Sequence, residues 1–258
     1  DVSEYYENCI ELFKRNGRLY KIFPSFTISA LAVRGDALNG NKKTGWNENE
    51  FLEFINRNGL FSEIDYSGFV ERIAPAIVRS CCDYTNYSCD FTGSGFKNII
   101  KAVSENSQNN DFGNFGSILD GTSSVNEVKI DKDFTNLIKY DDDDIVFKGY
   151  PAEQGNGVIV SPEFSFSISA NCANKQAAWD FIKSFIQDDY QSAITDPEEY
   201  MVWGIPLKKS CAEKGFTRES FSLASDDMQR ISDTLKERIT ELITCADCPN
   251  NLAENSRE

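Results

Sequence analysis

The chain has 258 residues, 40% hydrophobic and 12% aromatic, and this composition predicts a folded protein with one large domain or two lobes. Its formal net charge of −15 argues against binding to nucleic acids or anionic membranes. The absence of histidine excludes hydrolases that use a histidine base and removes the commonest metal ligand.

The first predicted elements are one helix and two strands. Residues 3–15 are predicted to form a helix that starts at Ser3 and ends at Asn16-Gly17. Residues 18–23 (RLYKIF) and 26–33 (FTISALAV) are predicted as strands, the second of them buried. The apolar face of the helix consists of Tyr6, Cys9, Ile10 and Phe13.

Three helices are predicted next along the chain. Residues 45–59 begin with a capping box, in which Asn47 precedes Glu50 by three positions. Residues 67–80 and 92–103 are the second and third predicted helices, and a polar loop follows the third. The predicted buried positions are Phe51, Phe54 and Ile55 in the first helix, and Phe96, Ile99, Ile100 and Val103 in the third.

The second half of the chain begins with a strand, IVFKGY, after the acidic run 141–144. Residues 163–170 (EFSFSISA) alternate strictly between apolar and polar side chains, which predicts a strand. Residues 174–188 are predicted as a helix capped by Asn174, and residues 225–244 as a last helix capped by Ser225. The predicted apolar face of the first of these helices consists of Ala178, Phe181, Ile182, Phe185 and Ile186. Strands thus alternate with helices, and this order predicts an α/β fold.

The cysteines and the acidic run were considered as metal sites. Cys245 and Cys248 form a single CxxC at the end of a helix, where a disulfide or two thiols is favoured over zinc. Cys82 and Cys89 flank a turn, and their spacing leaves a disulfide open. The acidic run lacks the glycine and final glutamate of a calcium loop, so a solvated turn is favoured. We therefore predict no metal and no cofactor.

The order of several segments resembles the extracellular solute-binding proteins of ABC sugar importers, the family that includes maltose-binding-like proteins. The most specific part runs from Gly149 to Gln191, with a turn, a glycine-rich stretch, a crossing strand and an Ala-Ala-Trp-Asp helix. The segments, in chain order, are LYKIFPSF, GWNENEF, CDFTGSGFKNII, GYPAEQGNG, FSISANCANKQAAWDFIKSFIQDDYQS and GIPLKKS.

The resemblance implies a type II periplasmic-binding-protein-like fold, with two lobes joined by crossing strands and a ligand held between them. Because the family's first strand–helix–strand unit does not precede Asp1, and its late helix is not found, one lobe is expected to be incomplete. The implied crossings are Lys21–Ile28, Phe164–Ala170 and Ile205–Lys208. The implied segments are 1–25 (remainder of lobe one), 26–162 (lobe two), 163–206 (lobe one) and 207–258 (helical, returning to lobe two).

The implied function is binding of an extracellular mono- or oligosaccharide and its delivery to the permease subunits of an ABC importer, without catalysis. A protein of this kind is periplasmic or is a lipoprotein anchored at the cell surface. No hydrophobic run reaches the length of a membrane-spanning helix. Two alternatives stay open: a glycoside hydrolase that uses two of the 41 acidic residues, and a stand-alone surface module for carbohydrate adhesion.

Candidate ligand-binding residues were chosen because sugars offer apolar C–H faces to aromatic rings and hydroxyl groups to polar side chains. One group follows the proline of the first crossing, and a second lies in the turn-rich segment after residue 149. Two tryptophans complete the set, although packing is favoured for Trp46 and is the assignment for Trp179. The candidates are Ser25, Phe26, Thr27, Trp46, Tyr150, Glu153, Asn156 and Trp203.

Overall fold

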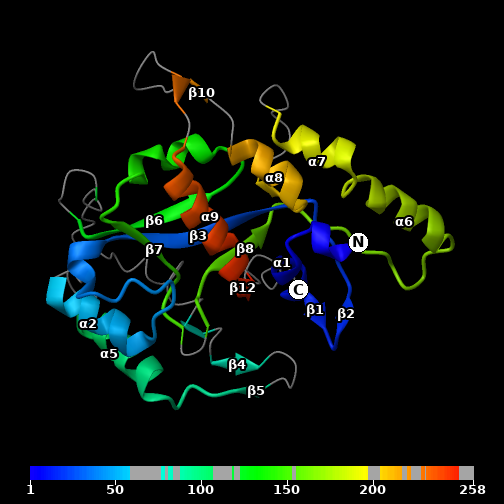
Figure 1. Ribbon diagram of the computed structural model, residues 1–258. Coiled ribbons are helices and arrows are strands. Elements are labelled where there is room, and N and C mark those ends of the chain that lie inside the picture. Colours follow the sequence, from blue (N-terminus) through cyan, green and yellow to red (C-terminus); the bar gives the residue numbers. More distant parts are fainter. Residues whose placement is uncertain are drawn as a thin grey trace. The chain divides into compact units, whose positions relative to one another are not determined.

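The computed structural model describes two compact units, each treated by itself below (Figure 1). In the described parts, unit 1 comprises Asp1–Ile28, Lys129–Asp141 and Val160–Asn251, and unit 2 comprises Ser29–Val128 and Asp142–Ile159. Helices and strands are mixed in both, so the predicted α/β class is confirmed. The described residues are 1–58, 77–78, 81–83, 88–106, 118, 123–152, 155–196, 204–216, 220–221, 228–229 and 231–249.

Strand β3 (Ser25–Arg34) is the longest described strand and continues from unit 1 into unit 2. Its first residues pair antiparallel with β9 (Ile205–Pro206), in the register Ser25↔Pro206. Its last residues pair antiparallel with β7 (Ile145–Lys148), from Leu31↔Lys148 to Arg34↔Ile145. Strands β8 (Ile159–Pro162) and β6 (Val125–Ile130) also pair with β3, and β12 (Cys248–Pro249) pairs with β8. The predicted strand 26–33 is confirmed.

Unit 1 is mainly helical around the first part of β3. Its helices are η1 (Val2–Glu4), α1 (Glu7–Glu11), η5 (Phe134–Tyr140), α6 (Lys175–Ser184), α7 (Asp188–Ile194), α8 (Lys209–Phe216) and α9 (Asp233–Cys245). Two short hairpins complete it: β1 (Lys14–Arg15) with β2 (Arg18–Leu19), and β10 (Ser220–Phe221) with β11 (Met228–Gln229).

The N-terminal helix is shorter than predicted, although its apolar face is buried as expected. Tyr5 is extended (φ −110°, ψ 165°) and separates η1 from α1, because Asp1 and not Ser3 caps the first turn. Asn16 and Gly17 have positive φ and form the turn of the β1–β2 hairpin. The side chains of Tyr6, Cys9, Ile10 and Phe13 are each 5% exposed or less.

The C-terminal helix α9 packs on α1 in unit 1. The Asn8 side-chain amide donates to the carbonyls of Ile243 (2.7 Å) and Ala246 (3.2 Å). The helix begins after Ser232, whose hydroxyl accepts from the Leu235 amide at 3.0 Å, and so starts later than predicted; the predicted cap, Ser225, lies outside the described residues. The described residues between 207 and 249 belong to the same compact unit as residues 1–28, and the implied lobe boundaries stay a prediction.

The predicted second and third crossings both lie in unit 1. Residues 163–170 do not form the predicted strand; their described backbone bonds to other segments are the isolated bridge Ile22↔Phe166 and one bond from the Glu163 amide to the Ser25 carbonyl (3.3 Å). Strict alternation alone does not make a strand when the backbone groups have no neighbouring strand to bond. Residues 205–208 lie against the N-terminal segment, through β9 and the bridge Tyr5↔Lys208.

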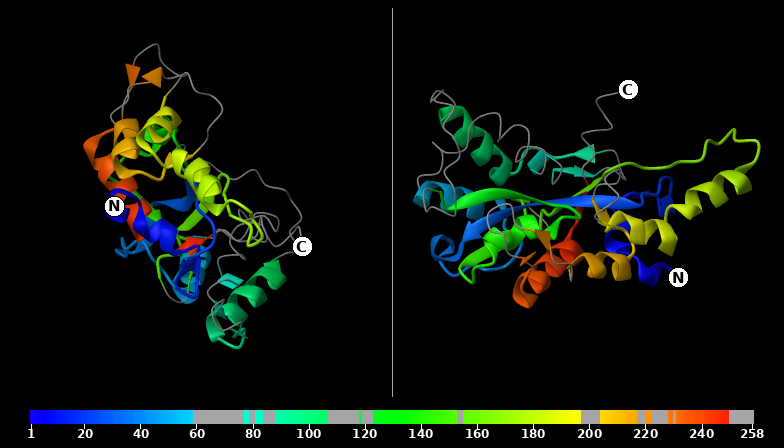
Figure 2. Two further views of the ribbon diagram at one scale, coloured as in Figure 1. Left: turned by 90° about the vertical axis from the view of Figure 1, so that its right-hand side faces the viewer. Right: turned by 90° about the horizontal axis from the view of Figure 1, so that it is seen from above.

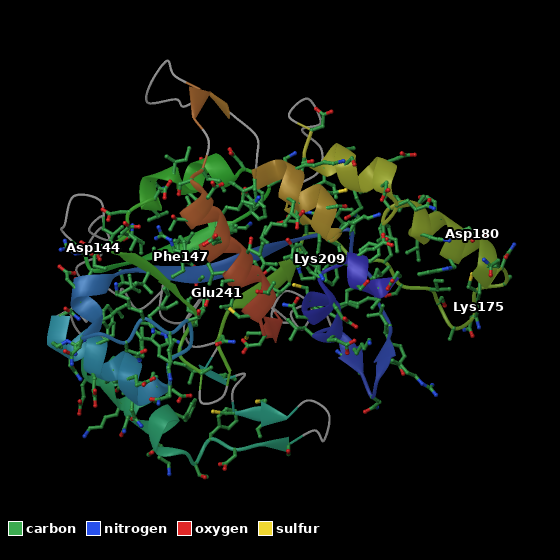
Figure 3. The ribbon with its side chains drawn as sticks, viewed as in Figure 1. Asp144, Phe147, Lys175, Asp180, Lys209 and Glu241 are labelled. Carbon is green, nitrogen blue, oxygen red and sulfur yellow. The ribbon has the colours of Figure 1, made fainter. Side chains whose placement is uncertain are left out.

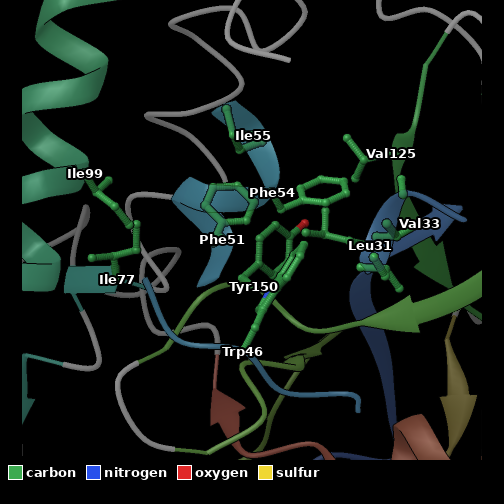
Figure 4. Close-up of a cluster of buried hydrophobic side chains, with 12 residues drawn as sticks. Leu31, Val33, Trp46, Phe51, Phe54, Ile55, Ile77, Ile99, Val125 and Tyr150 are labelled. Atoms are coloured by element: carbon green, nitrogen blue, oxygen red, sulfur yellow. The ribbon is translucent and has the colours of Figure 1, made fainter. Parts of the chain in front are cut away.

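Unit 2 has its own hydrophobic core (Figure 4). The other elements among its described residues are η2 (Gly35–Leu38), α2 (Glu48–Asn58), β4 (Cys82–Asp83), β5 (Ser88–Cys89) and α5 (Ser94–Asn106). The predicted capping box is confirmed: the Asn47 side chain accepts from the Glu50 amide (3.0 Å), and the Glu50 carboxylate accepts from the Asn47 amide (2.9 Å). Phe51, Phe54 and Ile55 are buried as predicted. Ile100 is 45% exposed, so its predicted burial is wrong, while the predicted helix 67–80 lies almost wholly outside the described residues.

Candidate ligand-binding site

Three predicted ligand residues begin β3 in unit 1, and all three are buried. Ser25 and Phe26 have no exposed surface, and Thr27 is 1% exposed. Phe26 packs edge-to-face against Tyr6 (ring centroids 5.7 Å apart), and the Thr27 hydroxyl donates to the Ser161 carbonyl at 3.4 Å. The Ser25 hydroxyl has no hydrogen-bond partner among the described residues, which makes it a destabilising group that a ligand or water would satisfy.

The buried side-chain amide of Gln191 connects the chain segments next to these residues, a role that the sequence pattern did not predict. Gln191 on α7 has no exposed surface. Its amide nitrogen donates to the carbonyls of Pro24 and Phe185, both at 2.9 Å, and its amide oxygen accepts from the Lys208 backbone at 2.8 Å. Because all three partners are backbone groups, Gln191 fixes the start of β3 relative to the end of β9.

Gly204, at the start of the third predicted crossing, leaves no room for a side chain. It has φ +91°, and a Cβ atom there would lie 2.8 Å from the Phe26 carbonyl oxygen and 3.0 Å from Cγ of Glu163. Glycine therefore allows this chain segment to run directly beside β3. The neighbouring candidate Trp203 lies outside the described residues, as does Glu153.

In unit 2 the structure brings three predicted residues together: Trp46, Tyr150 and Asn156. The Trp46 indole N–H donates to the Gly149 carbonyl (2.8 Å), and the Tyr150 amide donates to the Gly157 carbonyl (2.9 Å). A Cβ atom on Gly149 would overlap the carbonyl of Asn156. The turn-rich segment 149–157 therefore doubles back on itself through glycine contacts and packs on the residues before α2.

The aromatic rings of this cluster belong to the core of unit 2. Trp46 is 4% exposed and lies edge-to-face with Phe51 at 5.1 Å, while Tyr150 is 1% exposed and its hydroxyl bonds to the Glu127 carboxylate (Figure 4). Asn156 is half-buried and is the one described candidate that keeps accessible surface. The geometry favours packing for Trp46, and the ligand role of the whole set stays a prediction.

A buried lysine beside Trp46 is a second feature that the sequence reasoning missed. Lys148, the last residue of β7, has no exposed surface. Its ammonium group lies 4.8 Å from the centre of the Trp46 ring and donates to the carbonyls of Asn41 and Lys43. Burial lowers the pKa of Lys148 to about 8, and the charge of Glu50 opposes that shift. A lysine of this kind can change protonation near neutral pH.

The third missed feature is an aromatic surface in unit 1 that we call the α6 face: Phe164, Phe166, Phe181 and Phe185. Helix α6 lies at the outer end of unit 1, farther from α9 than α7 does (Figures 1 and 2), and Figure 3 shows Lys175 and Asp180 on it. Phe181 is 62% exposed, which contradicts its predicted burial, and Trp179 is 40% exposed, which contradicts its assignment to packing. The phenylalanine rings contact one another in series, from Phe164–Phe166 (5.3 Å) to Phe181–Phe185 (5.1 Å).

The charged side chains determine whether the chain could hold a metal ion. Among the described residues, no three His, Cys, Asp or Glu side chains are placed to hold a metal ion. The acidic run is used within the fold: Asp141 accepts from the Ser232 hydroxyl (2.6 Å) and backbone amide (3.1 Å). Burial raises the pKa of Asp131. None of the described helices has both the length and the apolar character needed to cross a membrane.

Comparisons with known proteins find relatives by structure alone. No protein-family model matches the chain, and no curated protein matches its sequence. An extracellular solute-binding protein of family 1 from Alicyclobacillus acidocaldarius aligns with 99% of this chain, at a TM-score of 0.54 and 12% identity. The sugar-binding protein MalE from Xanthomonas citri aligns with 100% of it, at a TM-score of 0.53 and 14% identity.

The chain has the fold of the maltose-binding-like solute-binding proteins. The family resemblance read from the order of segments is thereby confirmed at the level of fold. The chain spans 68% of the Alicyclobacillus protein and 67% of the Xanthomonas protein, so it corresponds to about two thirds of each. At these identities the likeness concerns architecture, and side-chain roles have to be argued from this chain's own residues.

Proposed function

We propose that this chain is part of a protein that binds an extracellular carbohydrate and passes it to the permease of an ABC importer, without catalysing a reaction. The observation that carries the proposal is the fold shared with the family 1 solute-binding protein and with MalE, which is described as sugar-binding. The motif order in the sequence supports the same assignment independently of the structural comparison. A periplasmic location or a lipoprotein anchor at the cell surface goes with this role.

The local chemistry supports a neutral polar ligand. Segment 149–157 contains amide and hydroxyl side chains, together with glycines that allow close packing of the described backbone. Of the predicted contacts, Asn156 is the most accessible in the described parts and can both donate and accept a hydrogen bond, as a sugar hydroxyl requires. The Ser25 hydroxyl is a second group that lacks a partner among the described residues.

The test is thermal unfolding in the presence of a panel of mono- and oligosaccharides, with amino acids, short peptides and divalent cations as comparison ligands. It should use the protein together with all flanking sequence that its gene encodes, because the solved relatives are longer. A binding protein is stabilised by its ligand in proportion to the logarithm of ligand concentration. We expect a concentration-dependent rise in unfolding temperature with at least one sugar. Stabilisation by peptides or cations, with none by any sugar, would refute the carbohydrate assignment.

Binding and hydrolysis are separated by recovering the ligand. After prolonged incubation with the stabilising sugar, chromatography should return that sugar unchanged. Release of shorter sugars, lost on replacing one carboxylate, would contradict the proposal and support a glycoside hydrolase. The variant Asn156→Ala should weaken the sugar-dependent shift, whereas Asn171→Ala, at an exposed position of unit 1, serves as the matched control.

A further inference from the structure

The hairpin formed by β4 and β5 in unit 2 places two cysteines directly opposite each other (Figure 1). The strands are antiparallel, with the register Cys82↔Cys89 and Asp83↔Ser88. The two sulfur atoms are 2.8 Å apart. None of the eight cysteines, all of which lie in the described parts, is in a disulfide in this structure.

The backbone pattern identifies the kind of cross-strand pair. The Asp90 amide donates to the Cys81 carbonyl at 2.8 Å, which marks residues 81 and 90 as a hydrogen-bonded pair of the ladder. Pairs alternate along an antiparallel ladder, so Cys82 and Cys89 form a non-hydrogen-bonded pair, where side chains approach most closely. The short Cα separation of such pairs, about 4.5 Å, falls within the range that a disulfide spans.

Local contacts anchor the chain that follows Cys89. The Asp90 carboxylate accepts from the backbone amide (2.8 Å) and the hydroxyl (2.6 Å) of Thr92. Phe91 packs on Phe96 of α5, with ring centroids 5.0 Å apart. The strand that carries Cys89 is therefore held next to the following helix.

We propose that Cys82 and Cys89 are an oxidation site and form a disulfide that closes the hairpin. Cys89 is exposed and Cys82 is half-buried, so a small oxidant can reach the pair. Cys81 is adjacent in sequence, but successive side chains of a strand point to opposite faces, so Cys81 is directed away from Cys89. The register thus selects one partner from two neighbouring cysteines. This inference is independent of carbohydrate binding.

The oxidant is a low-molecular-weight disulfide such as oxidised glutathione. The Cys89 thiolate attacks one sulfur of the oxidant, which forms a mixed disulfide and releases one glutathione thiolate. The Cys82 thiolate then attacks the Cys89 sulfur and displaces the second glutathione thiolate. The two thiol protons pass to solvent or to the released thiolates. The protein loses two electrons, and the oxidant gains two.

The test is disulfide mapping of the folded chain after equilibration with oxidised and reduced glutathione. The reaction is stopped with acid, remaining thiols are alkylated with a maleimide, and the unreduced digest is analysed by mass spectrometry. We expect two fewer maleimide additions than in the reduced chain, and a linked peptide pair that joins Cys82 to Cys89. Linkage of Cys82 to Cys89 should exceed linkage of Cys81 to Cys89 by more than about tenfold, because wrongly placed sulfurs strain a disulfide.

Cysteine-to-serine variants show which thiols form the disulfide. Cys81→Ser should keep the linkage, whereas Cys82→Ser and Cys89→Ser should lose it, with circular dichroism to show that each variant folds. In denaturant the preference for Cys82 over Cys81 should disappear, because the register is lost. Full alkylation of both Cys82 and Cys89 in the folded, oxidised chain, or an equal yield of the Cys81–Cys89 linkage, would overturn the proposal.

Discussion

Gln191 shows how one side chain can position several chain segments in unit 1. Its amide satisfies backbone groups of Pro24, Phe185 and Lys208 and is fully buried. The sequence cannot predict this role, because Pro24 and Lys208 are far from Gln191 along the chain and a glutamine in a polar stretch has no pattern of its own. Its burial became visible only with the fold.

Replacing Gln191 with leucine tests this role. Leucine is similar in size but leaves three buried backbone groups without this partner, so we expect a loss of stability of about 2–3 kcal/mol. Chemical denaturation of the variant measures the change. Gln187→Leu is the matched control, because Gln187 is exposed and makes no side-chain cap bond to α7. Equal stability of the two variants would show that the amide of Gln191 does not hold the segments.

Lys148 gives a pH dependence with a definite sign. Burial lowers its pKa from 10.5 to about 8, so between these values the unfolded chain binds more protons at this site than the folded chain does. Stability therefore gains a contribution as pH rises through this window, on the order of 2–3 kcal/mol when complete. Lys148→Met should remove that contribution, as measured by denaturation at several pH values.

The control for this titration is Lys175→Met, because Lys175 is exposed on α6. It should keep the slope of the unchanged protein, because it leaves Lys148 and its surroundings in place. An identical slope in Lys148→Met and Lys175→Met would contradict the lowered pKa. The sequence predicted neither the burial nor the Trp46 contact, because Lys148 occupies a position in a strand that gives no sign of an enclosed amine.

At the scale of elements, local signals predicted helix starts well when the capping residues lay close together. Asn47 with Glu50 and Asn174 with Ala177 both form the expected caps. Helix α9 starts later than predicted, because Ser232 caps it and is also held by Asp141, whereas the predicted cap Ser225 lies outside the described residues. Residues 163–170 failed as a strand for another reason, since pairing requires a neighbour that local alternation does not supply.

The capping box of α2 has a measurable worth. Asn47→Ala removes the acceptor for the amides of Asn49 and Glu50, both at 3.0 Å, and should destabilise the protein by about 1 kcal/mol. The comparison variant Glu53→Ala changes an exposed position of the same helix and should change stability by less than about 0.5 kcal/mol. Denaturation midpoints of both variants measure these changes in stability. An unchanged midpoint for Asn47→Ala would show that the capping box does not stabilise the protein.

On the α6 face, helical periodicity does not predict which side chains are buried. Periodicity assigned Phe181 and Ile182 to one buried face, but Phe181 is 62% exposed and Ile182 is 5% exposed. Phe181→Ser should therefore leave stability within about 0.5 kcal/mol while reducing self-association and the binding of an apolar dye. Ile182→Ser should instead cost more than about 2 kcal/mol. If the dye bound equally before and after Phe181→Ser, the aromatic surface would not be the exposed apolar patch.

At the scale of the whole molecule, the order of segments predicted more than any single motif did. That order identified the solute-binding-protein fold, which two solved structures share with TM-scores above 0.5 despite identities of 12% and 14%. An architecture of this kind depends on the order of strands and helices more than on individual side chains, so it can be shared at low sequence identity. The ligand contacts did not follow from the order, since side chains near conserved turns of a fold can serve packing equally well.

The central claim is that this fold binds a sugar, and isothermal titration calorimetry tests it most directly. The protein, with all sequence that its gene encodes, is titrated with the saccharide that stabilises it most, and then with an amino acid and a divalent cation. The account predicts saturable binding of the saccharide to one site, weakened in Asn156→Ala, and no heat of binding for the other two. Saturable binding of the amino acid or the cation, with no heat from any saccharide, would contradict it.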